Sequence, residues 1–594
     1  MPAALQLPLI AVGVLTLLTL GYLLYGTFIA RQYKLDDSRT TPAVLKNDGE
    51  DFIPTRPFYL LGQHFSAIAA AGPIAGPIFA CMAFGWGPCL IWIIFGVILI
   101  GAVHDFSALI ASVRHGAHSI AEIAKETLGR RAWLALVCFI WLALLYVITA
   151  FTQITAQTFV GVSEELQGLN TTFNKGGAVA AASTLYLALA LLMGIVQRFL
   201  KPPMWLTTII FVPATLGCIW LGTRIDEVLV FGPMFWYTSI LLYCLIGSML
   251  PMWLLQQPRG YLGGFVLYFA IAVGALGVLF GGFEIKQPIW GGDSSMLDPF
   301  AFIHPPPGSG QQSWPITNML FPFLFVTIAC GACSGFHGLI CGGTTSKQIA
   351  KESHCKSIGF GAMLLEGFVA VIALATIMIV APEQSKGAPP ARIYGDGLAL
   401  FLTRFLGPEA FLFCATFGAM AFSTFVFDTL DVSTRLGRYL LQELFAAPGK
   451  VAGFLAAAAT AGIPLLMLLV ADPNAYRTFW TLFGTSNQLL AALTLLSITL
   501  WLRRNGKKYW YTLWPTVFVG TITVWALFIQ FYMGARDAMN GSWRTAAGAV
   551  NPTVPNAVVS LALLALAGVF VVEAMRTVKR GLRSQRLRPF GNQT

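Results

Sequence analysis

The chain has 594 residues, of which 56% are apolar and 11% are charged, whereas soluble globular proteins carry about 25% charged residues. This composition, with a mean hydropathy of +0.72, excludes a soluble enzyme, a disordered regulator and a nucleic-acid-binding protein. The net charge of +11 has a simple explanation, because membrane proteins collect lysine and arginine in their cytoplasmic loops. The chain is therefore predicted to be an all-α polytopic membrane protein.

About 15 segments satisfy the length of about 20 mostly apolar residues that a membrane span needs. If alternate loops are assigned to opposite sides, 28 of the 37 lysines and arginines fall on one side. This asymmetry predicts an outside N-terminus and an inside C-terminus. The segment at 397–406 is too short to span and is expected to be a helix within a loop. The predicted spans are 4–30, 65–84, 88–112, 132–160, 178–196, 204–223, 233–255, 261–281, 319–340, 358–380, 411–434, 451–470, 478–500, 509–533 and 556–575.

The span at 65–84 contains two Gly-Pro pairs, Gly72-Pro73 and Gly76-Pro77. Each proline removes a backbone donor from the helix, and each glycine allows another backbone or a ligand to approach. A kinked structural helix is one explanation. The two pairs favour the other, a discontinuous helix, because unwound backbone at membrane depth persists where it lines a cavity or is buried in protein.

A second break is predicted at 327–346, where small residues surround Ser334, Gly335 and His337. Close helix packing by small residues is the alternative. Cys330, Cys333 and His337 have a spacing that resembles a metal site, but they share one apolar segment, and we expect no metal there.

The two broken segments run in opposite directions, which is the sequence signature of a transporter binding site. Half-helix N-termini would then face an anionic substrate group. This arrangement predicts a five-plus-five inverted repeat within a single membrane domain. The predicted substrate-binding residues are Gly72, Pro73, Gly76, Pro77, Ser334, Gly335 and His337. The predicted parts are a first repeat at 65–223, intervening helices at 233–281, an outer loop at 282–318, a second repeat at 319–500 with an insert at 381–410, C-terminal helices at 509–575 and a basic tail at 576–594.

Three carboxylates inside predicted spans, Asp105, Glu366 and Asp428, are candidates for proton or ion coupling. An unpaired charge in the membrane costs about 2.5 kcal/mol or more, so such residues mark ion paths by default. His104 is a further candidate because histidine titrates near neutral pH. Structural hydrogen bonding is the alternative for Asp105 and Glu366.

Asp431 has its own alternative explanation, an interfacial ion pair with Arg435 four residues further along the helix. Ser423 and Thr424 are predicted to complete a sodium site with carbonyls of the broken 65–84 segment, with ordinary interhelical hydrogen bonding as the alternative. The sequence contains no nucleotide-binding or hydrolase motif, so we expect neither an enzyme nor a cofactor.

Four stretches resemble the carbon starvation protein A family of prokaryotic transporters. They are Phe65-Ser66-Ala67-Ile68-Ala69 with Gly72 to Pro77, Gly101-Ala102-Val103-His104-Asp105-Phe106, Ala329 to His337 with Gly343-Thr344-Thr345, and Leu482 to Leu490. The resemblance extends from about residue 30 to about residue 530. Members of the family often carry glutamine at the position of His104, so the resemblance implies no role for that residue.

The resemblance implies uptake of short peptides or pyruvate across the inner (cytoplasmic) membrane of a prokaryote, coupled to an ion gradient, most simply protons. It also implies membership of the amino acid–polyamine–organocation superfamily, whose core is a five-plus-five repeat. The expected partners are the small-molecule substrate and membrane lipid. The alternative function is a nutrient sensor without transport, with the basic tail contacting a partner. That tail contains Arg576, Lys579, Arg580, Arg583, Arg586 and Arg588.

Overall fold

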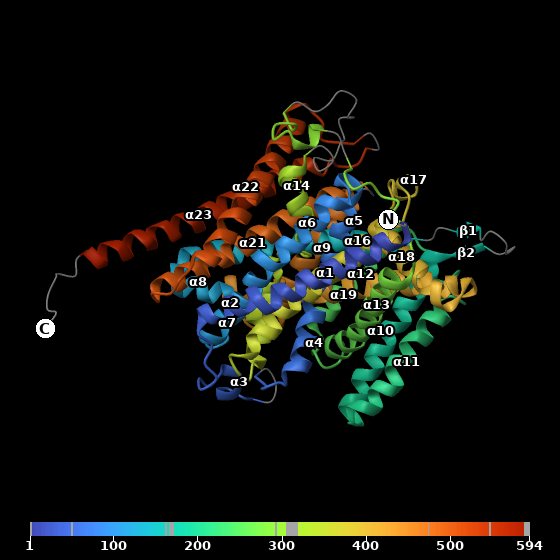
Figure 1. The fold of residues 1–594 in the computed structure, drawn as a ribbon, viewed down its shortest axis with the longest axis horizontal. Coiled ribbons are helices and arrows are strands. Elements are labelled where there is room, and N and C mark those ends of the chain that lie inside the picture. The colour runs from blue at the N-terminus through green and yellow to red at the C-terminus, as the bar shows by residue number, and fades with distance from the viewer. Residues whose placement is uncertain are drawn as a thin grey trace.

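The described part of the protein is a bundle of helices (Figure 1). The computed structural model describes residues 3–48, 52–69, 71–160, 163–165, 172–291, 294–303, 319–472, 475–545 and 548–586. Its two strands, β1 (Ser163–Glu165) and β2 (Thr172–Asn174), pair antiparallel with Ser163 opposite Asn174. This small ribbon was not predicted, and it immediately precedes helix α10.

Twelve helical segments of the described chain are long and apolar enough to cross a membrane, and a bent pair makes up to 13. The protein is thus a multi-pass membrane protein. The twelve coincide with twelve of the predicted spans. They are η1 to α2 (Ala3–Tyr33), α6 to α7 (Trp86–Arg114), α9 (Arg130–Phe159), α10 (Lys175–Phe199), α11 (Met204–Gly222), α13 (Gln256–Phe280), η7 to α16 (Lys356–Met378), η8 to α19 (Pro408–Leu444), α20 (Lys450–Val470), α21 (Tyr476–Arg504), α22 (Trp510–Met539) and most of α23 (Thr553–Arg586).

The remaining three predicted spans take other forms. The segment at 65–84 belongs to a bent pair, α4 (Pro57–Ile68) and α5 (Gly72–Phe84), with 46° between them. The segment at 233–255 contains α12 (Pro233–Met249), which has only 17 residues. The segment at 319–340 is divided between α14 (Leu320–Thr327) and α15 (Gly335–Gly343). Both segments are therefore discontinuous, as predicted, but the first break lies between Ile68 and Gly72, and the two Gly-Pro pairs belong to α5.

Two of the long helices contain a π-helical segment next to a carboxylate. The segment η3 (Val97–Gly101) leads into α7 (Ala102–Arg114), which carries Asp105, and η7 (Lys356–Gly361) leads into α16 (Ala362–Met378), which carries Glu366. A π segment widens a helix and often occurs at a functional site. Here η7 packs against α7, since a β-carbon at Gly359 would lie 2.9 Å from the α-carbon of Phe106.

Short helices occupy the connections. They are α3 (Pro42–Leu45), α8 (Ile120–Leu128), η4 (Ser294–Leu297), η6 (Thr345–Gln348), α17 (Pro382–Ser385) and α18 (Pro390–Leu406). The helix expected at 397–406 is the second half of α18, which packs between α13, α16 and α19 and is largely buried.

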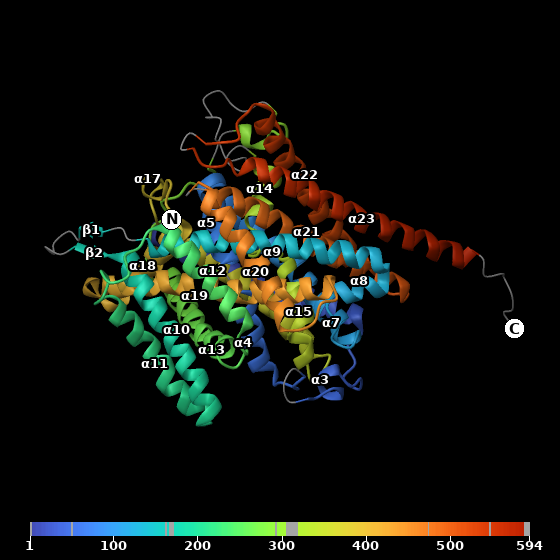
Figure 2. The ribbon, with the colours of Figure 1, turned by 180° about the vertical axis from the view of Figure 1, so that it is seen from behind.

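The predicted tail boundary at 576 is not a helix end, because α23 continues to Arg586. Figure 2 shows α23 extending from one edge of the bundle and the α10–α11 hairpin at the opposite edge. Residues 587–594, including Arg588, lie outside the described residues.

Candidate functional site

Side chains of helix α21 (Tyr476–Arg504) fix the conformation of the non-helical segment between α14 and α15. The side chain of Asn487 accepts a hydrogen bond from the Phe336 amide (2.9 Å) and donates to Ser334 Oγ (3.0 Å) and Cys330 Sγ (3.1 Å). The next residue, Gln488, donates to the Phe325 carbonyl (2.9 Å). A helix end leaves backbone groups unpaired, and the side chains of Asn487 and Gln488 pair with two of them, the Phe336 amide and the Phe325 carbonyl.

Two tryptophans complete this support. Trp480 on α21 donates to the Thr327 carbonyl, and Trp92 on α6 (Trp86–Gly96) donates to the Ile328 carbonyl, each at 3.2 Å. The Leu482–Leu490 stretch, which sequence analysis used only for the family resemblance, thus has a structural role: it stabilises the broken helix.

The two breaks meet in the middle of the bundle. A β-carbon at Gly72 would collide with Cys330, one at Gly76 would lie 2.6 Å from the Thr327 carbonyl oxygen, and one at Gly331 would lie 3.5 Å from the α-carbon of Pro73. At Gly76 the approaching backbone excludes a β-carbon, and at Gly72 the Cys330 side chain does so, whereas the distance from Gly331 to Pro73 is an ordinary van der Waals contact.

The predicted substrate-binding residues therefore come together, but they are packed against one another. Gly335 abuts the backbone of α21, and Pro73 and Pro77 are buried in α5. A cavity beside Asn487, Ser486 and Phe336 has about 10 Å³, which is room for about one water molecule. In this conformation the breaks form a closed contact.

A histidine–carboxylate centre (His104, Asp105, His337 and Glu366) lies next to this contact. His337 Nδ1 is 2.8 Å from Asp105 Oδ2, and His337 Nε2 is 3.1 Å from Glu366 Oε2. His104 Nδ1 is 2.7 Å from Asp105 Oδ1. The four side chains are at most 1% exposed, so three of the predicted coupling residues and one predicted substrate residue form a single site.

The centre can shift a proton without changing its charge. A charged imidazole at His337 donates to two carboxylates, whereas a neutral one donates to one carboxylate and accepts from a protonated carboxyl. Both arrangements hold the same number of protons. A proton can therefore move between Asp105 on α7 and Glu366 on α16 through the imidazole carried by α15.

Sequence analysis missed His64, which lies on α4 next to the first break. Its Nδ1 is 2.8 Å from Thr345 Oγ1 of η6, and its Nε2 is buried without a hydrogen-bond partner among the described residues. The predicted span began at residue 65, so His64 was not counted as intramembrane, whereas α4 (Pro57–Ile68) carries it into the bundle.

A second buried cluster (the arginine–aspartate cluster) consists of Arg259, Asp428 and Asp431, with Tyr243 beside them. Arg259 Nη2 is 2.9 Å from Asp428 Oδ1, and Nη1 contacts both Asp431 and the Tyr243 hydroxyl. Arg259 is 1% exposed. The sequence analysis counted it as an ordinary loop charge, which was wrong, because α13 begins at Gln256 and carries it into the bundle.

The interfacial pair between Asp431 and Arg435 is also wrong. Arg435 instead donates to the carbonyls of Gly247 and Leu250 at the end of α12, each at 2.8 Å. A helix C-terminus presents unpaired carbonyls and a partial negative charge, which attract a guanidinium. Asp431 instead pairs with Arg259 and accepts a hydrogen bond from the Tyr243 hydroxyl at 2.7 Å.

A cavity of about 170 Å³ opens over the arginine–aspartate cluster. Its lining includes Thr424, whereas the neighbouring Ser423 hydroxyl pairs with Ser183 of α10 at 3.1 Å. The two hydroxyls of the predicted sodium site thus face α10 and this cavity. Helix α19 (Phe411–Leu444) packs on α9, α10, α12, α13, α18 and α20, and a shared site with the carbonyls of α5 stays a prediction.

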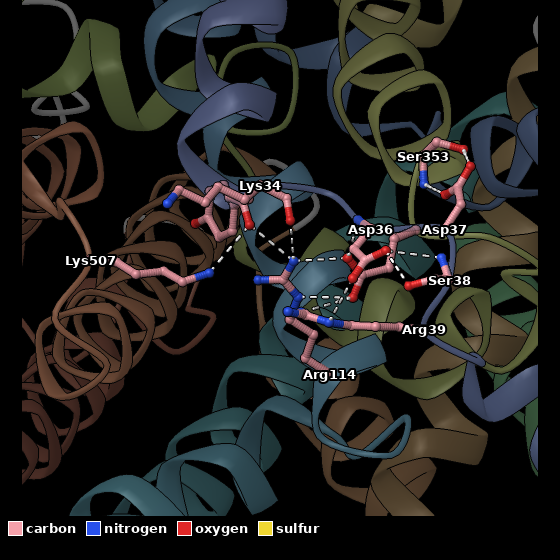
Figure 3. A network of polar contacts seen from close by, with 10 residues as sticks. Lys34, Asp36, Asp37, Ser38, Arg39, Arg114, Ser353 and Lys507 are labelled. Atoms are coloured by element: carbon pink, nitrogen blue, oxygen red, sulfur yellow. Dashed lines mark hydrogen bonds and ion pairs between the residues drawn. The ribbon is translucent and has the colours of Figure 1, made fainter.

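A polar network closes the end of the bundle that the charge distribution predicts to be cytoplasmic (Figure 3). Arg114 at the end of α7 makes two bonds to Glu352, at 3.0 and 2.8 Å, and one to the Tyr33 carbonyl at 3.0 Å. Asp37 accepts from the Ser353 amide and hydroxyl. The network thereby joins the N-terminal segment and α7 to the segment before η7.

Hydrogen bonds lower the pKa of two carboxyl groups of this network, Glu352 and Asp37. Partial burial alone would raise the pKa of Glu352, but the hydrogen bonds from Arg114 and from the Asp36 amide lower it below its ordinary value. The two bonds from Ser353 likewise lower the pKa of Asp37. Both groups are therefore ionised at neutral pH, as the network requires.

These features define a class of membrane protein: a multi-pass helical bundle in which two broken helices meet beside buried charged side chains. No group of three or more potential ligands is arranged to hold a metal ion in the described part of the chain. The carbon starvation protein CstA family model matches residues 4–392 and 384–526. The chain belongs to that family.

Two relatives that cover most of this chain are named as transporters. The pyruvate/proton symporter BtsT of Escherichia coli (strain K12) is 30% identical, with 88% of this chain and 81% of the relative covered. The peptide transporter CstA of Bacillus subtilis (strain 168) is 30% identical, with 96% of each covered. Among solved structures, the Eremococcus coleocola manganese transporter in complex with an aromatic bis-isothiourea compound is 12% identical, with a TM-score of 0.43 and 89% and 98% coverage.

Proposed function

We propose that the protein is a proton-coupled secondary transporter that imports a small carboxylate, pyruvate or a short peptide, across the inner membrane of a prokaryote. The observation that carries the proposal is the histidine–carboxylate centre, in which His337 joins Asp105 to Glu366. A buried centre of this kind in a span marks a proton path. The family relatives named a pyruvate/proton symporter and a peptide transporter support the choice of substrates.

The position of the centre supports coupling to helix movement. His337 lies on α15, directly after the break, whereas Asp105 and Glu366 lie on two other helices. Movement of α15 relative to α7 or α16 would lengthen a hydrogen bond of the imidazole and expose a carboxylate. Protonation of that carboxylate removes the cost of exposing or moving an unpaired charge at membrane depth.

Alternating access then requires a closure that opens in turn at each side. The Arg114–Glu352 network is the proposed inner closure, because it joins the end of α7 in the first predicted repeat to the segment before η7 in the second. Its opening would let the bundle separate at that end while the opposite end closes. The inverted repeat at 65–223 and 319–500 is part of this proposal.

The test is uptake by proteoliposomes that contain the purified full chain. Labelled pyruvate and labelled alanyl-alanine are offered separately, first with an imposed pH gradient and then with a sodium gradient. We expect one of them to accumulate when the interior is alkaline. Uptake driven by sodium alone would overturn proton coupling and direct attention to Ser423 and Thr424.

The second candidate, a nutrient sensor without transport, makes a different prediction in the same assay. Neither substrate would accumulate under any gradient, although one would still bind to the purified protein. The helix-bound basic residues Arg576, Lys579 and Arg580 would then be tested as a partner surface. We favour contact with anionic lipid for these residues, because juxtamembrane basic clusters attract such lipids.

A further inference from the structure

The cavity over the arginine–aspartate cluster has a lining suited to a small amphiphilic anion. Arg259 is the one cationic side chain among its described lining residues, and four hydroxyls from Ser183, Thr184, Ser239 and Thr424 are distributed around it. The rest of the wall is mainly aromatic and aliphatic. Ligand sites typically combine apolar walls with a few placed polar groups. The lining residues also include Phe159, Tyr186, Leu187, Trp236, Ile240, Tyr243 and Phe427.

Two features of individual side chains point to a missing polar ligand. The Thr424 hydroxyl is buried at the cavity without a hydrogen-bond partner, although the residue is only 2% exposed. A buried polar group without a partner is uncommon and costly. In addition, the side chain of Asp428 is 26% exposed, whereas that of Asp431 is 7% exposed. Asp428 is therefore the more exposed of the two carboxylates that pair with Arg259, and Arg259 itself lines the cavity.

We propose that this cavity binds the carboxylate of the transported substrate, with Arg259 as the anion-binding group and Thr424 as a hydrogen-bond donor. The inference rests on the proposed function and names the place of substrate recognition. A guanidinium presents paired donors that match the two oxygens of a carboxylate. The apolar wall would receive the methyl or side-chain end of the substrate.

The size of the cavity agrees with a small substrate. A volume of about 170 Å³ corresponds to roughly a dozen water-sized positions, because one position requires about 10 to 15 Å³. A three-carbon oxo acid fits within it, and a dipeptide of two small residues would fill it. The space beside Asn487, Ser486 and Phe336, with about 10 Å³, has room for neither.

The charge of the cluster links substrate to proton. Arg259 with Asp428 and Asp431 carries one excess negative charge when all three are ionised. A substrate carboxylate would add a second excess charge in an apolar cavity, which is strongly unfavourable. We therefore expect Asp428 to take a proton from the cavity water when the anion binds, and to release Arg259 Nη2 to it. The titratable groups that face this pair are Asp431 of α19, Tyr243 and Cys244 of α12 and Tyr186 of α10.

Equilibrium binding to the purified full chain tests the inference, with labelled pyruvate and labelled alanyl-alanine as the two probes. Thr424→Val is expected to weaken binding by at least about fivefold, the loss of one bond to a charged group. The matched control is Thr416→Val. Thr416 is on the same helix, is fully buried and has a hydroxyl without a partner, but it lies outside the cavity lining. Its substitution is expected to leave binding unchanged.

Two charge variants probe the anion site directly. The double variant Arg259→Gln/Asp428→Asn preserves the total charge and is expected to lose more than about 100-fold in affinity, since the guanidinium provides the carboxylate contact. Asp428→Asn alone resembles the protonated state of Asp428. This variant is therefore expected to bind the labelled probe at alkaline pH with the affinity that the wild type shows at acidic pH. A purely structural role of Asp428 would not remove the pH dependence. Pyruvamide, which lacks the charge, is expected not to compete.

The outcomes separate this inference from the proposed function. If the wild type accumulates a substrate but Thr424→Val and Asp428→Asn bind it with wild-type affinity and wild-type pH dependence, the inference is overturned and the transport proposal stands. Competition by pyruvamide equal to that by pyruvate overturns carboxylate recognition. If the wild type neither binds nor accumulates either probe, both proposals fail. A double variant that fails to fold leaves the decision to the two single variants.

Discussion

The two buried charge clusters have the same composition pattern and different surroundings. In each, one nitrogen base lies between two carboxylates: His337 between Asp105 and Glu366, and Arg259 between Asp428 and Asp431. The first is enclosed by three helices and is at most 1% exposed. The second opens into the cavity of about 170 Å³.

The difference shows how one bundle separates two tasks. Histidine can release its proton near neutral pH, whereas arginine remains charged. A histidine enclosed by carboxylates can pass a proton along but has no room for a ligand. An arginine beside open space can hold an anion but does not carry the proton itself. We infer that α7, α15 and α16 carry the proton path, whereas α13 and α19 carry substrate recognition, which the protonation of Asp428 accompanies.

The largest expected effect comes from Asp105→Asn. An amide cannot take up a proton, so accumulation driven by a pH gradient is expected to fall by roughly 100-fold, within the range attributed to a positioned proton-transfer group. Uptake in proteoliposomes measures it. The control Asp298→Asn makes the same chemical change at an exposed loop position. Accumulation by the Asp105 variant within threefold of the wild type would contradict the assignment of the proton path.

His337→Gln is expected to reduce stability strongly, by about 3–5 kcal/mol, because removal of one partner leaves buried charges uncompensated. Thermal unfolding of the purified protein measures the loss. The double variant His337→Gln/Glu366→Gln removes one of the stranded carboxylates and is expected to recover at least half of it. If the stability lost by the double variant equals the sum of the losses of the two single variants, the two residues do not interact.

Asn487→Leu tests the hydrogen bonds that fix the helix break beside the histidine–carboxylate centre. Loss of the amide leaves the Phe336 amide unpaired at the helix break, at an expected cost of about 1–3 kcal/mol. Thermal unfolding and uptake are measured together. Asn487→Asp keeps the acceptor for Phe336 and loses the donors to Ser334 and Cys330, so an effect larger than that of leucine would contradict the role of the acceptor.

The smallest effect is expected from Glu352→Gln in the network at the predicted cytoplasmic end. The pKa of Glu352 is lowered in the folded protein. Its contribution is therefore complete above the ordinary pKa of 4.5 and is lost as pH falls through the lowered value. The melting temperature of the wild type should exceed that of the variant by a constant amount from neutral pH down to about pH 4.5, and the gap should close below it.

The exposed residue Glu383 provides the control for that experiment. Glu383→Gln is expected to show no gap from the wild type at any pH. If the difference in melting temperature between the wild type and Glu352→Gln widens on acidification, the lowered pKa of Glu352 is refuted.

Local features of the sequence were sufficient for the membrane class, for twelve of the spans and for both helix breaks. Hydrophobic length and the Gly-Pro pairs act through neighbouring residues, so their consequences can be worked out without the fold. The same is true of Asp105, Glu366 and His337 as candidates, since a charge in an apolar span is unusual wherever the span packs. The partners of these three side chains could not be derived from the local sequence.

Tertiary structure decided the partners. His337 and Asp105 are 232 residues apart in the chain, and Arg259 and Asp431 are 172 apart. Arg259 resembled a loop charge until α13 carried it into the bundle. Gly72 and Gly335, whose role in substrate binding stays a prediction, pack against Cys330 and the backbone of α21. Such contacts depend on which helix faces lie together, and the burial of apolar and polar groups across the whole bundle sets that arrangement. The sequence by itself thus determined which groups are costly to bury, and only the assembled bundle decided how each cost is offset.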